Sequence, residues 1–281
     1  MSYLEAVLLG IVQGLTEFLP VSSSGHLVIL QHFFELNPES PEMILFDLAV
    51  HLGTVVAILV YYRQSIKKYL SHLGGSLKDL NHPILSYGRS ASVRFTVLAG
   101  VAIFGTGVFY VLFNDIVEEG FEKPWIVSVC WIVTGCVLLA TDYRRKCHRS
   151  LRQFGIMAAI LVGLAQGVAL FPGISRSGST ICVAILLGLH RRWAGEFSFL
   201  IGVPAIVGAL LIKGIGFFND ISDPLGWGPI LLGSVVSAVV GFAALTLLIW
   251  TLRKARLKYF AIYCYLIAVI SLIVFYGLNS V

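Results

Sequence analysis

Two short polar stretches, 20–26 and 172–180, interrupt long apolar segments and hold most of the side chains that could do chemistry. Arg176 is the one residue of the 20 basic residues that lies deep in such a segment, and Glu17 is the matching acid beside the first stretch. A charge inside a membrane is costly and normally faces a cavity or a partner. Arg176 and Glu17 therefore form either a structural ion pair or part of a site for an anion.

The groups around Arg176 favour a site for phosphate. A guanidinium can bind two oxygens of one anion, which the ammonium of a lysine cannot do. Both polar stretches lead into a predicted helix, and the free N–H groups at a helix N-terminus bind phosphate. Hydroxyl groups are frequent in both stretches: Ser22, Ser23 and Ser24 in the first, and Ser175, Ser177, Ser179 and Thr180 in the second.

Groups for proton transfer lie in and near the first stretch. Gln13 and Glu17 are four residues apart and so share one face of a helix, where a carboxylate could act as a base or hold a divalent cation. His26 is either a proton shuttle or a core histidine bonded to a backbone carbonyl, and we interpret His51 as structural. Ser23 is the favoured nucleophile, His26 is the runner-up, and a positioned water is also chemically possible.

The composition indicates a polytopic membrane protein. Of 281 residues 57% are hydrophobic and 12% are charged, and the mean hydropathy is +0.87, whereas a soluble domain carries roughly 25% charged residues. The pI near 9.0 does not indicate nucleic acid binding, because the basic residues lie in short segments between apolar runs. The five cysteines follow no disulfide or metal-binding spacing.

Two kinds of apolar segment are present. The segments 4–36 and 154–189 each have a polar centre, and neither half is long enough to cross a bilayer, which needs about 20 residues. Each is predicted to be a re-entrant hairpin that enters and leaves on one side. Six uninterrupted segments are predicted to be transmembrane helices: 43–62, 93–113, 125–141, 197–215, 229–252 and 260–278.

The charges of the loops predict the orientation, because loops rich in Lys and Arg stay in the cytoplasm. Four segments are basic: 63–94, with Arg63, Lys67, Lys68, Lys78, Arg89 and Arg94 against Asp79; 142–152, with Arg144, Arg145, Lys146, Arg149 and Arg152; Arg191 and Arg192; and 253–258, with Arg253, Lys254, Arg256 and Lys258. Two other loops are acidic: Asp115, Glu118, Glu119 and Glu122 in one, Asp220 and Asp223 in the other. Both termini and the first hairpin are therefore expected on the outer side, and the second hairpin enters from the cytoplasm.

The two hairpin segments also align with each other at one constant offset. Seven residues of the first are repeated in the second: Gly10, Gln13, Gly14, Phe18, Ser22, Ser24 and Gly25 match Gly163, Gln166, Gly167, Phe171, Ser175, Ser177 and Gly178. The fold class is therefore an all-α polytopic membrane protein, a single membrane domain over 1–281. It has two repeats, about 1–142 and about 154–279, each a hairpin plus three transmembrane helices. Because three is odd, the repeats are inverted, and their turns meet near the bilayer midplane.

Three short motifs of this chain resemble those of a known family. Residues 13–17 (QGLTE) are similar to the (E/Q)xxxE motif of undecaprenyl-diphosphate phosphatases of the bacitracin-resistance type. Residues 172–180 (PGISRSGST) resemble their PGxSRSxxT motif, and 22–26 (SSSGH) resemble their Ser/His turn. The resemblance covers essentially the whole chain, although Gln13 leaves one carboxylate rather than two in the first motif.

The resemblance implies removal of the terminal phosphate from undecaprenyl diphosphate, which recycles the lipid carrier of cell-wall synthesis. It also implies a bacterial plasma (inner) membrane protein with its site open to the outer face, a polyprenyl diphosphate lipid as substrate, and help from a divalent cation, Mg²⁺ or Ca²⁺. Bacitracin is expected to act on the substrate rather than on the protein. The functional positions it implies are Glu17, Ser23, His26, Ser175, Arg176 and Thr180.

Two other classes of protein share some of these features. The type 2 phosphatidic acid phosphatases also join Ser-Gly-His to Ser-Arg, but they need a histidine six positions after the arginine, where this chain has Cys182. A transporter or flippase of a polyprenyl phosphate lipid remains the alternative, because inverted repeats and a midplane site are transporter features.

Overall fold

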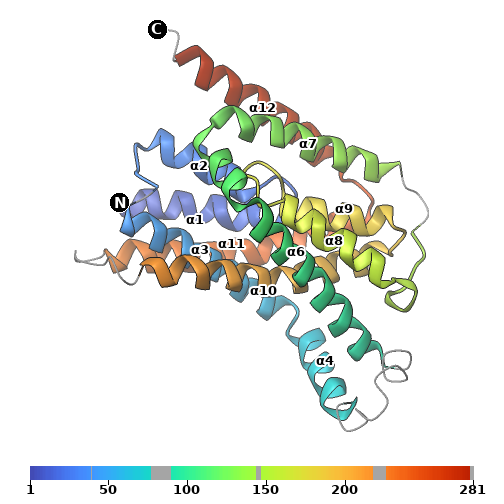
Figure 1. The fold of residues 1–281 in the computed structure, drawn as a ribbon. Helices are drawn as coiled ribbons and strands as arrows, with labels where there is room; N and C mark the ends of the chain where they lie inside the picture. The colour runs from blue at the N-terminus through green and yellow to red at the C-terminus, as the bar shows by residue number, and fades with distance from the viewer. Residues whose placement is uncertain (39, 77–89, 144–146, 218–225, 279–281) are drawn as a thin grey trace.

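The computed structural model describes residues 1–38, 40–76, 90–143, 147–217 and 226–278, and these residues are helical almost throughout (Figure 1). A 3₁₀ turn, Leu151–Gln153, lies between α7 and α8. The α-helices are α1 (Tyr3–Phe18), α2 (Ser23–Phe33), α3 (Pro41–Tyr61), α4 (Arg63–Ser76), α6 (Ala91–Glu122), α7 (Pro124–Asp142), α8 (Ile156–Val168), α9 (Arg176–Leu186), α10 (Arg191–Phe217), α11 (Trp227–Arg253) and α12 (Lys258–Leu278).

Five of these helices, α3, α6, α7, α10 and α11, are long and apolar enough to cross a membrane. They coincide with the first five predicted transmembrane helices, so the multi-pass prediction is confirmed. The sixth predicted helix coincides with α12, which has 21 residues.

Helix α6 is much longer than its predicted span of 93–113. It continues to Glu122, so Asp115, Glu118 and Glu119 belong to its last turns, and the prediction of an acidic loop there is wrong. Pairs four residues apart sustain these turns: Asn114 donates to Glu118 at 2.9 Å, and Lys123 forms an ion pair with Glu119. Such pairs stabilise an exposed helix, so apolar residues are not needed for it to continue.

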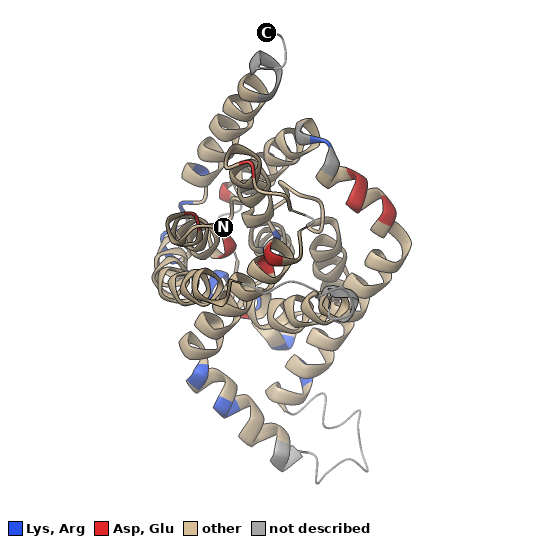
Figure 2. Cartoon of the chain, turned by 90° about the vertical axis from the view of Figure 1, so that its left-hand side faces the viewer, with Lys and Arg blue, Asp and Glu red and all other residues tan. Residues whose placement is uncertain are grey.

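The basic segment after α3 is also partly helical, contrary to the predicted loop. Helix α4 carries Arg63, Lys67 and Lys68, and Figure 2 shows basic residues along this helix, which extends away from the bundle. The hydroxyl of Tyr69 holds it to α10 by donating to Glu196 Oε1 at 3.3 Å. Burial raises the pKa of the Tyr69 phenol, so the group remains a donor.

Several predicted loop charges lie outside the described residues. They are Lys78, Asp79 and Arg89, Arg144, Arg145 and Lys146, and Asp220 and Asp223.

The two interrupted segments fold as pairs of short helices, α1 with α2 and α8 with α9. Their lengths are 16 and 11 residues, and 13 and 11 residues, so none alone spans the ~20 residues that a bilayer needs. In Figure 1 the first pair enters from the left, where the N-terminus lies, and the second pair enters from the right. The turns of the two pairs meet near the middle of the bundle.

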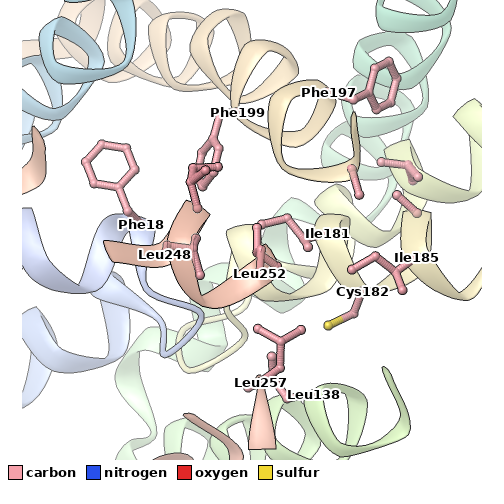
Figure 3. Close-up of a cluster of buried hydrophobic side chains, with 14 of the residues drawn as sticks. Phe18, Leu138, Ile181, Cys182, Ile185, Phe197, Phe199, Leu248, Leu252 and Leu257 are labelled. Carbon is pink, nitrogen blue, oxygen red and sulfur yellow. The ribbon is translucent and has the colours of Figure 1, made fainter. Parts of the chain in front are cut away.

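A buried apolar cluster lies behind the two turns and joins helices that are far apart in the sequence (Figure 3). Phe18 of α1 packs edge-on against Phe199 of α10, with ring centroids 5.7 Å apart. Ile181 and Cys182 of α9 and Leu248 of α11 complete this part of the cluster. The ends of α1 and α9 are therefore fixed by side chains of both halves of the chain.

Helix α3 packs closely on α11 at Gly53. A Cβ at this position would lie 2.3 Å from the carbonyl oxygen of Ser234, which real packing does not allow, so the backbones would have to separate. Gly100 in α6 has no atom within 4 Å of its Cβ position and provides a matched comparison.

We therefore predict that Gly53→Ala destabilises the protein by about 1–3 kcal/mol, the usual cost of an overpacked site. Gly100→Ala should leave stability unchanged or raise it slightly, because alanine favours the helix. Thermal unfolding of both purified variants in the same detergent checks this, and equal midpoints for the two would contradict the close packing of α3 on α11.

Candidate active site

The first turn is built around Ser22, the N-cap of α2. Its φ of 69° is unusual for a residue with a side chain. Its Oγ accepts from the N–H of Gly25 at 3.4 Å and from that of Gly173, in the second turn, at 3.1 Å. The Oγ of Ser24 lies 3.3 Å from that of Ser22. Ser22 therefore ties the two turns together.

The second turn repeats this arrangement. Ser175 is the N-cap of α9, and its Oγ accepts from the N–H of Gly178 at 3.0 Å. The Oγ of Ser177 lies 3.3 Å from that of Ser175 and donates to the carbonyl of Leu19 at 3.4 Å. Thr180 is fully buried and is bonded to the carbonyl of Arg176 at 2.8 Å and to Ser198 Oγ at 2.5 Å. In this conformation these hydroxyls are occupied in holding α9 in place.

Glu17 is the centre of the polar groups that the two turns bring together. Arg176 Nη2 lies 2.5 Å from Glu17 Oε1, so the ion pair, one of the two alternatives for these residues, is present. The other carboxylate oxygen, Oε2, accepts from Ser23 Oγ at 2.6 Å and from Gln13 Nε2 at 3.1 Å. Four of the predicted site residues, Gln13, Glu17, Ser23 and Arg176, are therefore in one hydrogen-bonded cluster.

Two polar atoms of this cluster are buried without a partner among the described residues: Arg176 Nη1 and Gln13 Oε1. A buried donor or acceptor without a partner costs about 1–3 kcal/mol, and such atoms call for an explanation such as a ligand. Arg176 also lies closely against α10, since a Cβ at Gly202 would be 1.8 Å from Nη1. The guanidinium thus occupies space that only glycine leaves open.

His26 is buried beside this cluster but is not bonded to it. Its Nδ1 donates to the carbonyl of Ser22 at 2.6 Å, and its Nε2 accepts from the hydroxyl of Tyr263 at 2.8 Å. Its ring stacks on Tyr263, with centroids 5.7 Å apart, and meets Trp131 edge-on at 5.1 Å. The contact of Glu17 with Ser23 is direct and does not pass through His26.

Sequence reasoning missed several residues that other helices contribute. His51 of α3, interpreted as structural, places Nε2 3.9 Å from Glu17 Oε2. Thr134 of α7 accepts from the N–H of Ser175 and donates to the carbonyl of Gly173, each at 3.1 Å. Trp131 donates to the carbonyl of Val21 at 2.8 Å. In the sequence, each of them is only a polar or aromatic side chain inside an apolar segment. Such a residue does not indicate which group it will contact.

The oxygen atoms of the cluster could bind a divalent cation only if a bound substrate supplied further oxygen atoms. The described residues contain no group of three His, Cys, Asp or Glu side chains that could hold a metal. Glu17 and the unpartnered Gln13 Oε1 nevertheless supply oxygen atoms, and Mg²⁺ commonly binds one or two carboxylates plus substrate phosphates.

The fold and the site define a polytopic membrane protein that holds an arginine, a carboxylate and a serine hydroxyl together inside its helical bundle. The model of a family described as Bacitracin resistance protein BacA matches residues 6–270. The chain belongs to this family, the BacA or undecaprenyl-diphosphatase family.

Relatives named undecaprenyl-diphosphatase are similar over almost their whole length. The protein from Halorhodospira halophila is 38% identical over 279 residues, 94% of this chain and 94% of the relative. That from Desulfatibacillum aliphaticivorans is 38% identical over 277 residues, 97% and 99% of the two chains. That from Halothermothrix orenii is 33% identical over 273 residues, 97% and 98%.

Proposed function

We propose that this chain hydrolyses undecaprenyl diphosphate to undecaprenyl phosphate and inorganic phosphate. The observation that carries the proposal is the cluster in which Glu17 joins Ser23 to Arg176, in a chain that matches proteins named undecaprenyl-diphosphatase over 94–97% of its length. Release of inorganic phosphate from the lipid diphosphate by purified protein in detergent tests it. A flippase alone would release none, because no membrane is present to be crossed.

Charge neutralisation and positioning are the main demands of phosphoryl transfer. Arg176 meets both demands: Nη2 stays on Glu17, and Nη1, which has no partner among the described residues, binds the terminal phosphate. Free N–H groups in the first turns of α2 and α9 add further donors. Ser22, Ser24, Ser175, Ser177 and Thr180 hold the two turns and the start of α9 in place, and so position these donors around the phosphate.

Ser23 is the nucleophile in this scheme. Its proton passes to Glu17 Oε2, 2.6 Å away, as Oγ forms a bond to the terminal phosphorus. The bond from that phosphorus to the bridging oxygen breaks, and its electron pair leaves with undecaprenyl phosphate. Water then displaces Ser23 Oγ from phosphorus; Oγ recovers its proton from Glu17, and both protons of the water leave with inorganic phosphate.

A divalent cation, Mg²⁺ or Ca²⁺, would be held by Glu17 and Gln13 together with diphosphate oxygens. When bound, it would neutralise charge on the leaving group. Because residues 13–17 supply a single carboxylate, Glu17, the substrate's own oxygens would be essential to binding of the cation.

The fold is two inverted repeats, about 1–142 and about 154–279. The matching caps support this: Ser22 to Gly25 and Ser175 to Gly178 are the same hydrogen bond at one offset, and so are the contacts of Ser22 with Ser24 and of Ser175 with Ser177. Opposite entry of the two helix pairs in Figure 1 also supports it. Such an architecture builds a site where the two turns meet.

The site and both termini face the outer side of the bacterial plasma membrane. The basic residues of α4 and of 253–258 would remain in the cytoplasm, and the acidic last turns of α6 would lie outside.

Cysteine labelling in intact cells tests this orientation. In a variant without native cysteines, we expect a membrane-impermeant thiol reagent to label Pro38→Cys, at an exposed position between α2 and α3, and not His148→Cys, between α7 and α8. Labelling of His148→Cys alone would reverse both the topology and the side from which substrate enters.

Arg176→Lys should lower turnover about 10²–10³-fold, the usual effect of removing a preorganised donor. The reason is that an ammonium cannot bond both Glu17 and the phosphate in the geometry of a guanidinium. Arg253→Lys, at the exposed end of α11, is the matched control and should keep normal turnover. A folded Arg176→Lys protein with most of its turnover intact would show that Arg176 does not need to bind both Glu17 and the phosphate.

The identity of the nucleophile is tested by rapid-quench trapping of the phosphoenzyme during turnover of the otherwise unchanged protein. We expect an adduct that survives acid and is lost in hot alkali, as a phosphoserine ester is, and that is absent when Ser23→Ala is added. His26 is the other candidate, although it would first have to release Tyr263. An acid-labile, alkali-stable adduct would assign the attack to His26, and near-normal turnover of Ser23→Ala alone would remove Ser23 from the chemistry.

A further inference from the structure

His51 of α3 holds its imidazole in one defined tautomer beside the site. Its Nδ1 lies 2.7 Å from the carbonyl oxygen of Asp47, and because a carbonyl oxygen can only accept, Nδ1 carries a proton. In the neutral ring the lone pair is therefore on Nε2. This atom faces Glu17 Oε2, and the side chain of His51 is 27% exposed.

The separation of these two atoms fits an ion between them better than a direct bond. At 3.9 Å the contact is too long for a hydrogen bond. In the neutral ring, the lone pair of Nε2 also has no attractive interaction with a carboxylate oxygen. Metal bonds to imidazole nitrogen and to carboxylate oxygen are about 2.0–2.2 Å long, so one ion can bridge two ligand atoms up to about 4.2 Å apart.

A third side chain with an available oxygen, Gln13, contacts the same carboxylate through its amide nitrogen. Gln13 Nε2 donates to Glu17 Oε2 at 3.1 Å, while Gln13 Oε1 is buried with no partner in the described part of the chain. The bond from His51 to a backbone carbonyl is also the usual second interaction of a metal-bound histidine, because it fixes the ring and makes the other nitrogen a better ligand.

We propose that His51 is a metal ligand, and that its Nε2 shares one divalent ion with Glu17 Oε2 and Gln13 Oε1. The proposal rests on the proposed function in one respect: diphosphate oxygens complete the coordination and offset the nearby positive charge of Arg176. An imidazole ligand favours Mn²⁺ and later transition metals relative to Ca²⁺, which prefers oxygen. The site is therefore mixed nitrogen and oxygen, in contrast to an all-oxygen site.

Pulsed EPR of the full-length protein in detergent, loaded with Mn²⁺ and inorganic pyrophosphate, tests this directly. We expect modulation from one imidazole nitrogen on the bound Mn²⁺. His51→Gln should remove that modulation and weaken Mn²⁺ binding about tenfold or more, because a ligand contributes at least as much as its outer partners. His148→Gln, at an exposed position far along the chain, is the control and should keep both.

Four results would overturn the proposal: bound Mn²⁺ without nitrogen modulation, modulation that persists in His51→Gln, modulation lost in His26→Gln instead, and no binding of Mn²⁺. Phosphate release with Mg²⁺ is measured separately on the same preparation. A nitrogen-coupled Mn²⁺ site in a protein that releases no phosphate would reject the proposed function alone, and normal phosphate release without nitrogen coupling would reject the metal site alone.

Discussion

The ion pair between Glu17 and Arg176 is the interaction on which the rest of the structure depends. It joins residues that are 159 positions apart and that belong to different helix pairs. Two charges inside a membrane protein lose much of their hydration, and removing one partner of such a pair typically costs 3–5 kcal/mol because the other charge is left uncompensated. Neither turn can therefore hold its charged residue unless the other turn is in place.

The backbone of the two turns imposes a second constraint. Irregular backbone at membrane depth needs partners within the protein, because lipid offers none. Serines at the helix N-caps supply some of them, Thr134 and Trp131 of α7 supply others, and Ser22 bonds the opposite turn at Gly173. The abundance of hydroxyl groups, which the sequence suggested was for phosphate, is thus largely explained by the turns themselves, and Ser23 is distinguished by its bond to Glu17.

Sequence patterns predicted the features that depend on residues close together in the chain. Apolar length predicted six spans, five of which coincide with the long apolar helices among the described residues, and the polar interruptions predicted helices too short to cross. Glu17 and Arg176 could be paired because each was a charge that apolar surroundings cannot leave alone. The contributions of His51, Tyr263 and Thr134 could not be predicted, because they depend on which helices pack beside the turns. The length of α6 was missed because pairs of charged and polar side chains sustain a helix without apolar residues.

The same pair also matters for the proposed binding of phosphate by Arg176. Arg176 uses Nη2 to satisfy Glu17 and keeps Nη1 buried, with no bond to any described residue. An unpaired buried donor is costly, so Nη1 lowers the stability of the folded protein. A phosphate oxygen that binds Nη1 recovers that cost without breaking the ion pair, whereas an anion that displaced Glu17 would leave a carboxylate unpaired. In the proposed mechanism the arrangement would therefore favour ligands that add to the pair, with Glu17 still in contact with Ser23.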